Sequence, residues 1–304
     1  MQVRRVGAAQ GSRWVLGGFR LLATKPLALL ALVIFDVFLL LMPSVLPIVG
    51  PLVPTLLTPV FGVGLMVAMR ETDRGGNPGP QMLFAAFGEA GGHAWRNLLV
   101  LGAISAIATM GAVALTALAD GGALFDSVTG MEEGVAPVAG TDGGTAGSGT
   151  GAGGDAAAGA GDAPGAGAPL VLPDISPALL VFLLLLLPIQ AGSWYAPLFI
   201  AWHRIPVAKS IFFSFVAVWR NKAAFAVYIV AWIAAVVAIS TVVSWLMLLT
   251  GVSTITSMLL FFMSLAILTA MYGSVWLSYR DVIEAGARDE APPDAGPPAG
   301  AAGG

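Results

Sequence analysis

The chain has 304 residues, of which 57% are hydrophobic and only 10% are charged, and its formal net charge is −3. Soluble domains carry about 25% charged residues, and disordered chains combine low hydrophobicity with high charge, so both classes are excluded for the bulk of the chain. Without cysteine there are no disulfides, thiolate nucleophiles or cysteine-ligated metals, and His93 and His203 are the only imidazoles. The composition predicts an integral membrane protein without a cofactor or metal.

The first predicted spans follow a basic N-terminus. Residues 1–26 carry five cations and are expected to include an interfacial helix on the cytoplasmic side. The apolar run from Leu27 is longer than the core of a signal peptide, which has about 7–15 residues, and no small-residue cleavage site follows it. We therefore expect a retained transmembrane helix at about 27–47 and a second at about 52–69, separated by a proline-rich turn.

A third span and a long loop complete the first half of the chain. Within residues 27–119, a second interfacial helix at 81–97 leads into an uncharged run at 98–119. Residues 120–176 then contain eight acids, no lysine or arginine, and many glycines and alanines. We expect this segment to be a flexible extracytoplasmic loop.

The second half of the chain, residues 177–284, has the same organisation. A span at 177–202 is followed by a third interfacial helix at 204–222 and by a 55-residue run without a charge. That run is long enough for two spans, which we place at 223–249 and 254–277. The Pro/Gly/Ala-rich tail at 285–304 is expected to be disordered.

Six spans give a consistent topology. With this number, all 14 lysines and arginines fall on one side of the membrane and the acidic loop falls on the other. Basic residues are enriched in cytoplasmic segments. The sequence therefore predicts a multi-pass protein of the bacterial inner membrane with both termini in the cytoplasm.

An internal repeat is indicated by three segments with helical polar stripes. Two of them end in the same triplet, Trp95-Arg96-Asn97 and Trp219-Arg220-Asn221, each followed by a span. The stripes are Arg13, Gly17, Arg20 and Thr24; Ala85, Glu89, His93 and Arg96; and Ser210, Ser214, Ala217 and Asn221. Aromatic residues on the other faces, including Trp14, are expected at the lipid boundary. The predicted fold is all-α, with six transmembrane helices as three hairpins, each preceded by an interfacial amphipathic helix. The alternative is that any six-helix protein alternates spans with basic loops and aromatic boundaries.

Three stretches of sequence carry a family resemblance. Residues 11–19, 210–215 and 218–222 resemble an uncharacterised family of six-helix inner-membrane proteins of beta-proteobacteria. More loosely, the design is similar to the membrane module attached to some glycerophosphodiester phosphodiesterases. The resemblance covers most of the chain except the Gly-rich loop and the tail. It implies an architecture and no activity.

Two polar residues inside predicted spans are candidate proton or ion sites. Asp36 is the only charge within a span, where a charge costs about 2.5–3.5 kcal/mol. It is either a relay facing the bundle interior or a protonated acid that bonds to a neighbouring helix through Gln190, Ser105 or Thr109. Gln190 itself lies between Pro188 and Pro197, where a broken helix could expose backbone groups to a ligand or simply kink.

The expected function follows from these features. The chain lacks nucleophile, metal and paired-carboxylate motifs, so we expect neither an enzyme nor a nucleic-acid-binding protein. We expect an organiser of lipid or membrane-protein partners, and the alternative is a small-solute or proton-coupled transporter that uses Asp36. Six cations are candidate contacts for anionic lipid headgroups, unless they only set topology: Arg20, Lys25, Arg96, Lys209, Arg220 and Lys222.

Overall fold

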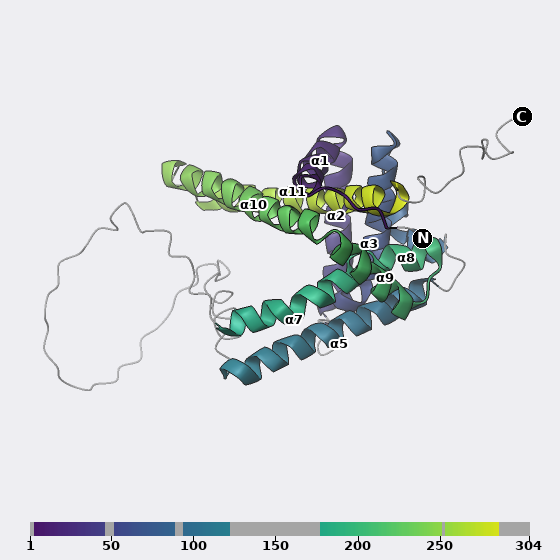
Figure 1. The fold of residues 1–304 in the computed structure, drawn as a ribbon. Helices are drawn as coiled ribbons and strands as arrows, with labels where there is room; N and C mark the ends of the chain where they lie inside the picture. The colour runs from purple at the N-terminus through teal and green to yellow at the C-terminus, as the bar shows by residue number, and fades with distance from the viewer. Residues whose placement is uncertain (1–2, 46–51, 89–93, 122–176, 251–252, 286–304) are drawn as a thin grey trace, which may run out of the picture. The chain divides into compact units, whose positions relative to one another are not determined.

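The computed structural model describes residues 3–45, 52–88, 94–121, 177–250 and 253–285 (Figure 1). All regular elements in these ranges are helical, as the sequence predicts. They are α1 (Gln10–Thr24), α2 (Pro26–Leu41), η1 (Met42–Val45), α3 (Leu52–Asp73), η2 (Pro80–Phe84), α4 (Ala85–Gly88), α5 (Ala94–Asp120), α7 (Pro177–Ser193), α8 (Ala196–His203), α9 (Val207–Arg220), α10 (Lys222–Thr250), α11 (Ser253–Tyr279) and the π-helix η3 (Arg280–Glu284).

Five described helices are long and apolar enough to cross a membrane. They are Val53–Asp73, Ala94–Leu118, Leu179–His203, Lys222–Leu246 and Met258–Glu284. A sixth span is counted if α1 and α2, which meet at 103°, are taken as one bent pair. The six-span expectation therefore depends on the short helix α2, which has 16 residues.

Several predicted segments lie wholly or partly outside the described residues. The loop at 120–176 is described only at its first residues, and the tail at 285–304 only at its first. Of the interfacial helix expected at 81–97, η2 and α4 cover the beginning, whereas Trp95 to Asn97 already belong to the first turn of α5. Glu89 and His93 are not described.

The chain divides into two compact units, and all the contacts discussed below lie within one of them. This unit comprises residues 1–109 and 187–304, and the other comprises 110–186. In the first unit, α1 packs against α10 and α11, and α2 packs against α3 and α11.

Two glycines determine how closely α1 packs. A methyl group at Gly11 would overlap the carbonyl oxygen of Ala224 in α10, and one at Gly18 would overlap that of Ala270 in α11. Trp14, on the same face of α1, is therefore only 1% exposed. The expectation that Trp14 lies at the lipid boundary is wrong, because the glycines let the backbones approach until the indole is enclosed.

The stripe on α9 also faces the protein. Ser210, Ser214, Ala217 and Asn221 are all buried. Phe212 and Trp219 are each 62% exposed on the opposite side, as expected for aromatics at a lipid boundary. In α9 the small and polar residues thus make contacts within the protein.

The corner between α1 and α2 is held by Lys25. Its Nζ donates hydrogen bonds to the carbonyl oxygens of Gly75 and Gly76 and to Oδ1 of Asn77, in the turn after α3. Gly75 has a φ of +86°, a conformation that glycine adopts without steric cost and that commonly ends a helix. The end of α3 is thereby fixed beside the start of α2.

Candidate functional site

Asp36 lies in an apolar environment. It is 2% exposed and shares the buried face of α2 with Leu29, Leu32 and Val33. Its Oδ1 has no hydrogen-bond partner among the described residues. One oxygen of the buried Asp36 carboxyl group thus has no partner in the described part of the chain.

The partners predicted for Asp36 have different surroundings. The side chain of Gln190 is exposed on α7, and Ser105 lies 3.1 Å from Ser193, Oγ to Oγ. The structure therefore brings Ser105 to the broken fourth span and leaves Gln190 on the surface of the unit. It shows no contact of either residue with Asp36.

We predict that Asp36→Leu folds at least as well as the wild type. Burying a polar group without a hydrogen bond costs free energy, and an apolar side chain of similar size removes that cost. The measurement is the midpoint of thermal unfolding in detergent, with Asp36→Asn as the variant that keeps a polar group. A lower midpoint for Asp36→Leu than for the wild type, with Asp36→Asn unchanged, would contradict the prediction and indicate a required polar contact.

The break in the fourth span is closed by a serine from another helix. Between α7 and α8, Ser214 Oγ accepts a hydrogen bond from the Tyr195 N–H at 2.9 Å and donates one to the Ala191 carbonyl at 2.7 Å. The backbone groups that a ligand could have used are therefore bonded within the protein. This arrangement favours a structural kink over a site for an ion or substrate.

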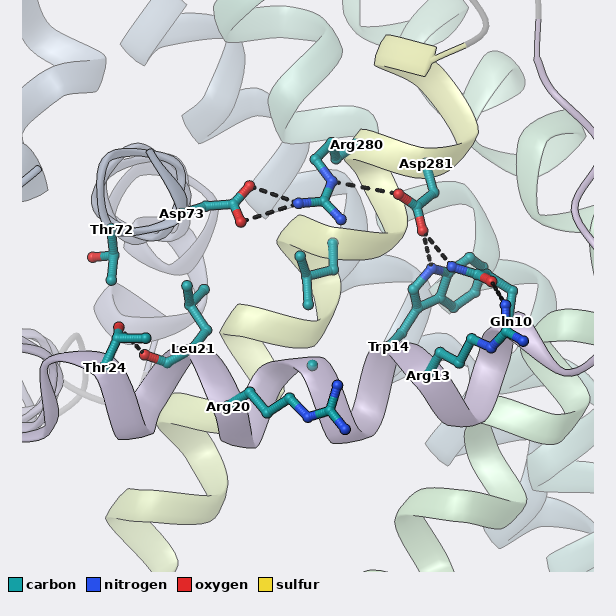
Figure 2. A pocket seen from close by; sticks show the side chains of 12 residues that line it. Gln10, Arg13, Trp14, Arg20, Leu21, Thr24, Thr72, Asp73, Arg280 and Asp281 are labelled. Carbon is teal, nitrogen blue, oxygen red and sulfur yellow. Dashed lines mark hydrogen bonds and ion pairs between the residues drawn. The ribbon is translucent and has the colours of Figure 1, made fainter. Parts of the chain in front are cut away.

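A polar pocket of about 400 Å³ lies between α1, the end of α3 and the C-terminal end of α11 (Figure 2). It is lined by Gln10, Arg13, Trp14, Gly17, Arg20, Leu21, Thr24, Thr72, Asp73, Leu277, Arg280 and Asp281. The complete predicted stripe of α1 is part of this wall. We call this cavity the α1 pocket.

One guanidinium holds two carboxylates on the far wall of the α1 pocket. Arg280 Nη1 donates to both oxygens of Asp73, at 3.0 and 2.8 Å, and its Nε lies 3.4 Å from Asp281 Oδ1. Asp281 Oδ2 also accepts hydrogen bonds from Gln10 Nε2 at 2.7 Å and Trp14 Nε1 at 2.9 Å. Arg280 and Asp281 belong to the π-helix η3, a distortion that is frequent at functional sites.

Two further arginines line the pocket from α1. Arg13 Nη1 donates a hydrogen bond to a neutral group, Gln10 Oε1, at 3.4 Å. Within the part of the chain that the structure describes, Arg20 has no hydrogen bond or ion pair. Figure 2 shows the Arg20 side chain extending along α1 beside the pocket, while Arg13 points toward Gln10. These two cations are not neutralised by the carboxylates opposite them.

The α1 pocket contains residues that the sequence reasoning did not single out. Asp73, Arg280 and Asp281 lie just beyond the predicted spans at 52–69 and 254–277. The sequence does contain a signal for this site, because Asp73 and Arg280 carry opposite charges and follow the ends of two predicted spans. Their pairing, however, joins residues 207 positions apart and depends on tertiary structure.

The predicted headgroup cations have unequal surroundings. Arg20, Arg96, Lys209, Arg220 and Lys222 are exposed, whereas Lys25 is half-buried with its ammonium bonded to the turn after α3. Two of the exposed cations lie over indole rings at the start of a span. Arg96 is 5.5 Å from the Trp95 ring and Lys222 is 5.2 Å from the Trp219 ring.

Comparison with known proteins places the chain in a family. It is 30% identical over 226 residues to a "probable inner membrane protein" of Burkholderia thailandensis, covering 74% of this chain and 73% of that protein. The chain belongs to the family of that protein. Together with the long apolar helices, this membership establishes a multi-pass membrane protein. No family model matches the chain, and no solved structure matches it.

Proposed function

We propose that the chain is a non-enzymatic inner-membrane protein that organises anionic lipids at the cytoplasmic surface. The observation that carries this proposal is the pair of exposed cation–indole contacts, Arg96 with Trp95 and Lys222 with Trp219. Tryptophan and basic residues at the ends of spans are typical anchors in the headgroup layer. The name of the relative, a probable inner membrane protein, agrees with this location.

The proposal includes the finer architecture expected from the sequence. We infer six spans in three hairpins, each preceded by an interfacial helix, with both termini in the cytoplasm. Each tryptophan of the two Trp-Arg-Asn triplets has a cation near its ring, Arg96 at Trp95 and Lys222 at Trp219, and each triplet lies where a long helix begins, which supports such a repeat. The looser likeness to the membrane module of some glycerophosphodiester phosphodiesterases stays a prediction of the same kind.

Transport through Asp36 is the less favoured function. A proton or cation relay needs a hydrated path, and Asp36 is packed on an apolar face, while Gln190 is exposed on α7. The closed break of the fourth span also leaves no free backbone groups at Tyr195 and Ala191 for a substrate. No specific observation therefore favours the transporter over the lipid organiser.

Lipid retained during purification tests the proposal. The full chain is purified in mild detergent and the anionic phospholipid bound per protein is quantified by mass spectrometry. We expect enrichment over the bulk membrane, and loss of at least half of it in the triple variant R96Q/R220Q/K222Q, because each cation near the surface contributes about 1 kcal/mol.

The control removes two cations elsewhere, one fewer than the triple variant. The variant R5Q/R74Q lowers the net charge without touching the cation–indole pairs and is expected to keep the wild-type lipid content. Wild-type protein with no enrichment over the bulk membrane would overturn the proposal. The same loss per cation removed in the triple variant and in the control would replace it with a general effect of net charge.

A further inference from the structure

We propose that the α1 pocket binds a phosphate group between Arg13 and Arg20, above Gly17. The inference rests on the proposed function where the phosphate belongs to a lipid headgroup, and it gives that function a defined site. The chemistry is shared by a lipid phosphate and a soluble phosphate ester, and the experiment below separates the two.

Helix geometry brings the two arginines within reach of one ligand. Arg13 and Arg20 are seven residues apart and therefore on one face of α1, about 10.5 Å apart along its axis. Both side chains are long, and each guanidinium presents donors in a fork that fits phosphate oxygens. Both are exposed and line the same cavity. A phosphate between them can accept hydrogen bonds from both.

Gly17 and Leu277 form the wall of the pocket between the two arginines. Gly17 carries no side chain, and a methyl group there would lie 2.5 Å from Leu277 Cδ1. The Leu277 side chain therefore packs directly on the helix backbone at Gly17, and the phosphate would lie over this apolar contact, held by the two guanidinium groups.

The charge distribution selects an anion. Three arginines and two aspartates line the pocket. The two carboxylates already accept hydrogen bonds from Arg280, and Asp281 accepts two more, from Gln10 and Trp14. They are therefore satisfied without a cation, whereas Arg20 has no such partner in the described part of the chain. The arginines of α1 are the groups left to be neutralised.

The orientation of α1 places the pocket where phosphates are found. Because α1 and α2 meet at 103°, α1 runs along the membrane surface when α2 crosses the bilayer. The pocket lies at the ends of α3 and α11. With α2 across the bilayer, these helix ends fall in the headgroup layer. A lipid phosphate can enter this site from the bilayer, and a soluble phosphate can enter it from the aqueous side.

The test is a binding titration on the full chain in neutral detergent. The probes are dioctanoyl phosphatidylglycerol and inorganic phosphate, and calorimetry reports the affinity for each. We expect R13Q/R20Q to weaken binding of the effective probe at least tenfold. R5Q/R74Q removes the same number of cations and is expected to bind like the wild type.

The outcomes distinguish the source of the ligand and the two proposals. Binding of the lipid that phosphate does not compete away identifies a headgroup, and binding of phosphate alone identifies a soluble ligand. If R13Q/R20Q binds as the wild type does while R96Q/R220Q/K222Q retains less lipid, the pocket is overturned and the lipid organiser stands. If R13Q/R20Q loses phosphate binding but retains wild-type lipid content, the site stands without the lipid role.

Discussion

Replacing both Gly11 and Gly18 with alanine is expected to destabilise the folded protein by about 2–6 kcal/mol. Each added methyl group would overlap a backbone carbonyl, that of Ala224 in α10 or that of Ala270 in α11. A methyl group at Gly11 would also lie 2.6 Å from the Tyr228 N, so no side-chain rotation relieves the contact. The helices must move apart, and the buried Trp14 loses part of its packing and its bond to Asp281.

The same substitution at Gly62 is the control for helix propensity. No atom lies within 4 Å of a methyl group there, and alanine favours a helix over glycine by about 1 kcal/mol. We therefore expect Gly62→Ala to match or exceed the wild type in thermal midpoint and in the monodisperse fraction on gel filtration. If the Gly11/Gly18 double variant behaves like Gly62→Ala, α1 does not pack against α10 and α11 as described.

The membrane helices could be predicted closely because lipid imposes a strong rule. Every backbone polar group in hydrocarbon must be satisfied internally, so a long uncharged run has to be helical. The runs at 223–249 and 254–277 correspond to α10 (Lys222–Thr250) and α11 (Ser253–Tyr279) within a few residues. Thr250, Gly251 and Ser253 alone are enough to predict a turn between the two runs.

The direction in which a helix face points could not be predicted in the same way. A polar stripe is compatible with water, with headgroups or with a buried hydrogen-bond network. On α1 the stripe containing Arg13 and Arg20 lines a pocket, whereas on α9 the stripe containing Ser214 and Asn221 is buried. The difference depends on which helices lie opposite, and that information is in residues far away in the sequence.

Asn221 illustrates the limit of the repeat. Asn97 occupies the same position in the other Trp-Arg-Asn triplet and is exposed. Asn221 is buried, and it accepts a hydrogen bond from the Val6 N–H at 2.9 Å and donates one to the Arg4 carbonyl at 3.1 Å. The triplet therefore supports a repeat in sequence. The two asparagines differ in their contacts, because only Asn221 has the N-terminal segment beside it.

Ser214→Ala is the second substitution for which we expect a large loss of folding free energy, of about 2–6 kcal/mol. The serine is fully buried, and its removal leaves the Tyr195 N–H and the Ala191 carbonyl without the partner that closes the fourth span. A buried polar group left unpaired costs about 1–3 kcal/mol, and Ser214→Ala leaves two such groups unpaired. The loss is measured as a fall in the thermal midpoint in detergent.

Ser264→Ala is the control for Ser214→Ala. It removes a hydroxyl group from a membrane helix without opening the break between α7 and α8. Ser264 Oγ donates to the Phe261 carbonyl of its own helix at 2.7 Å and is exposed, so alanine there should change the midpoint little. Equal midpoints for the two variants would mean that Ser214 does not hold the break. The backbone at Tyr195 would then have to be satisfied by water or by a ligand, and the transporter hypothesis would gain the site that it now lacks.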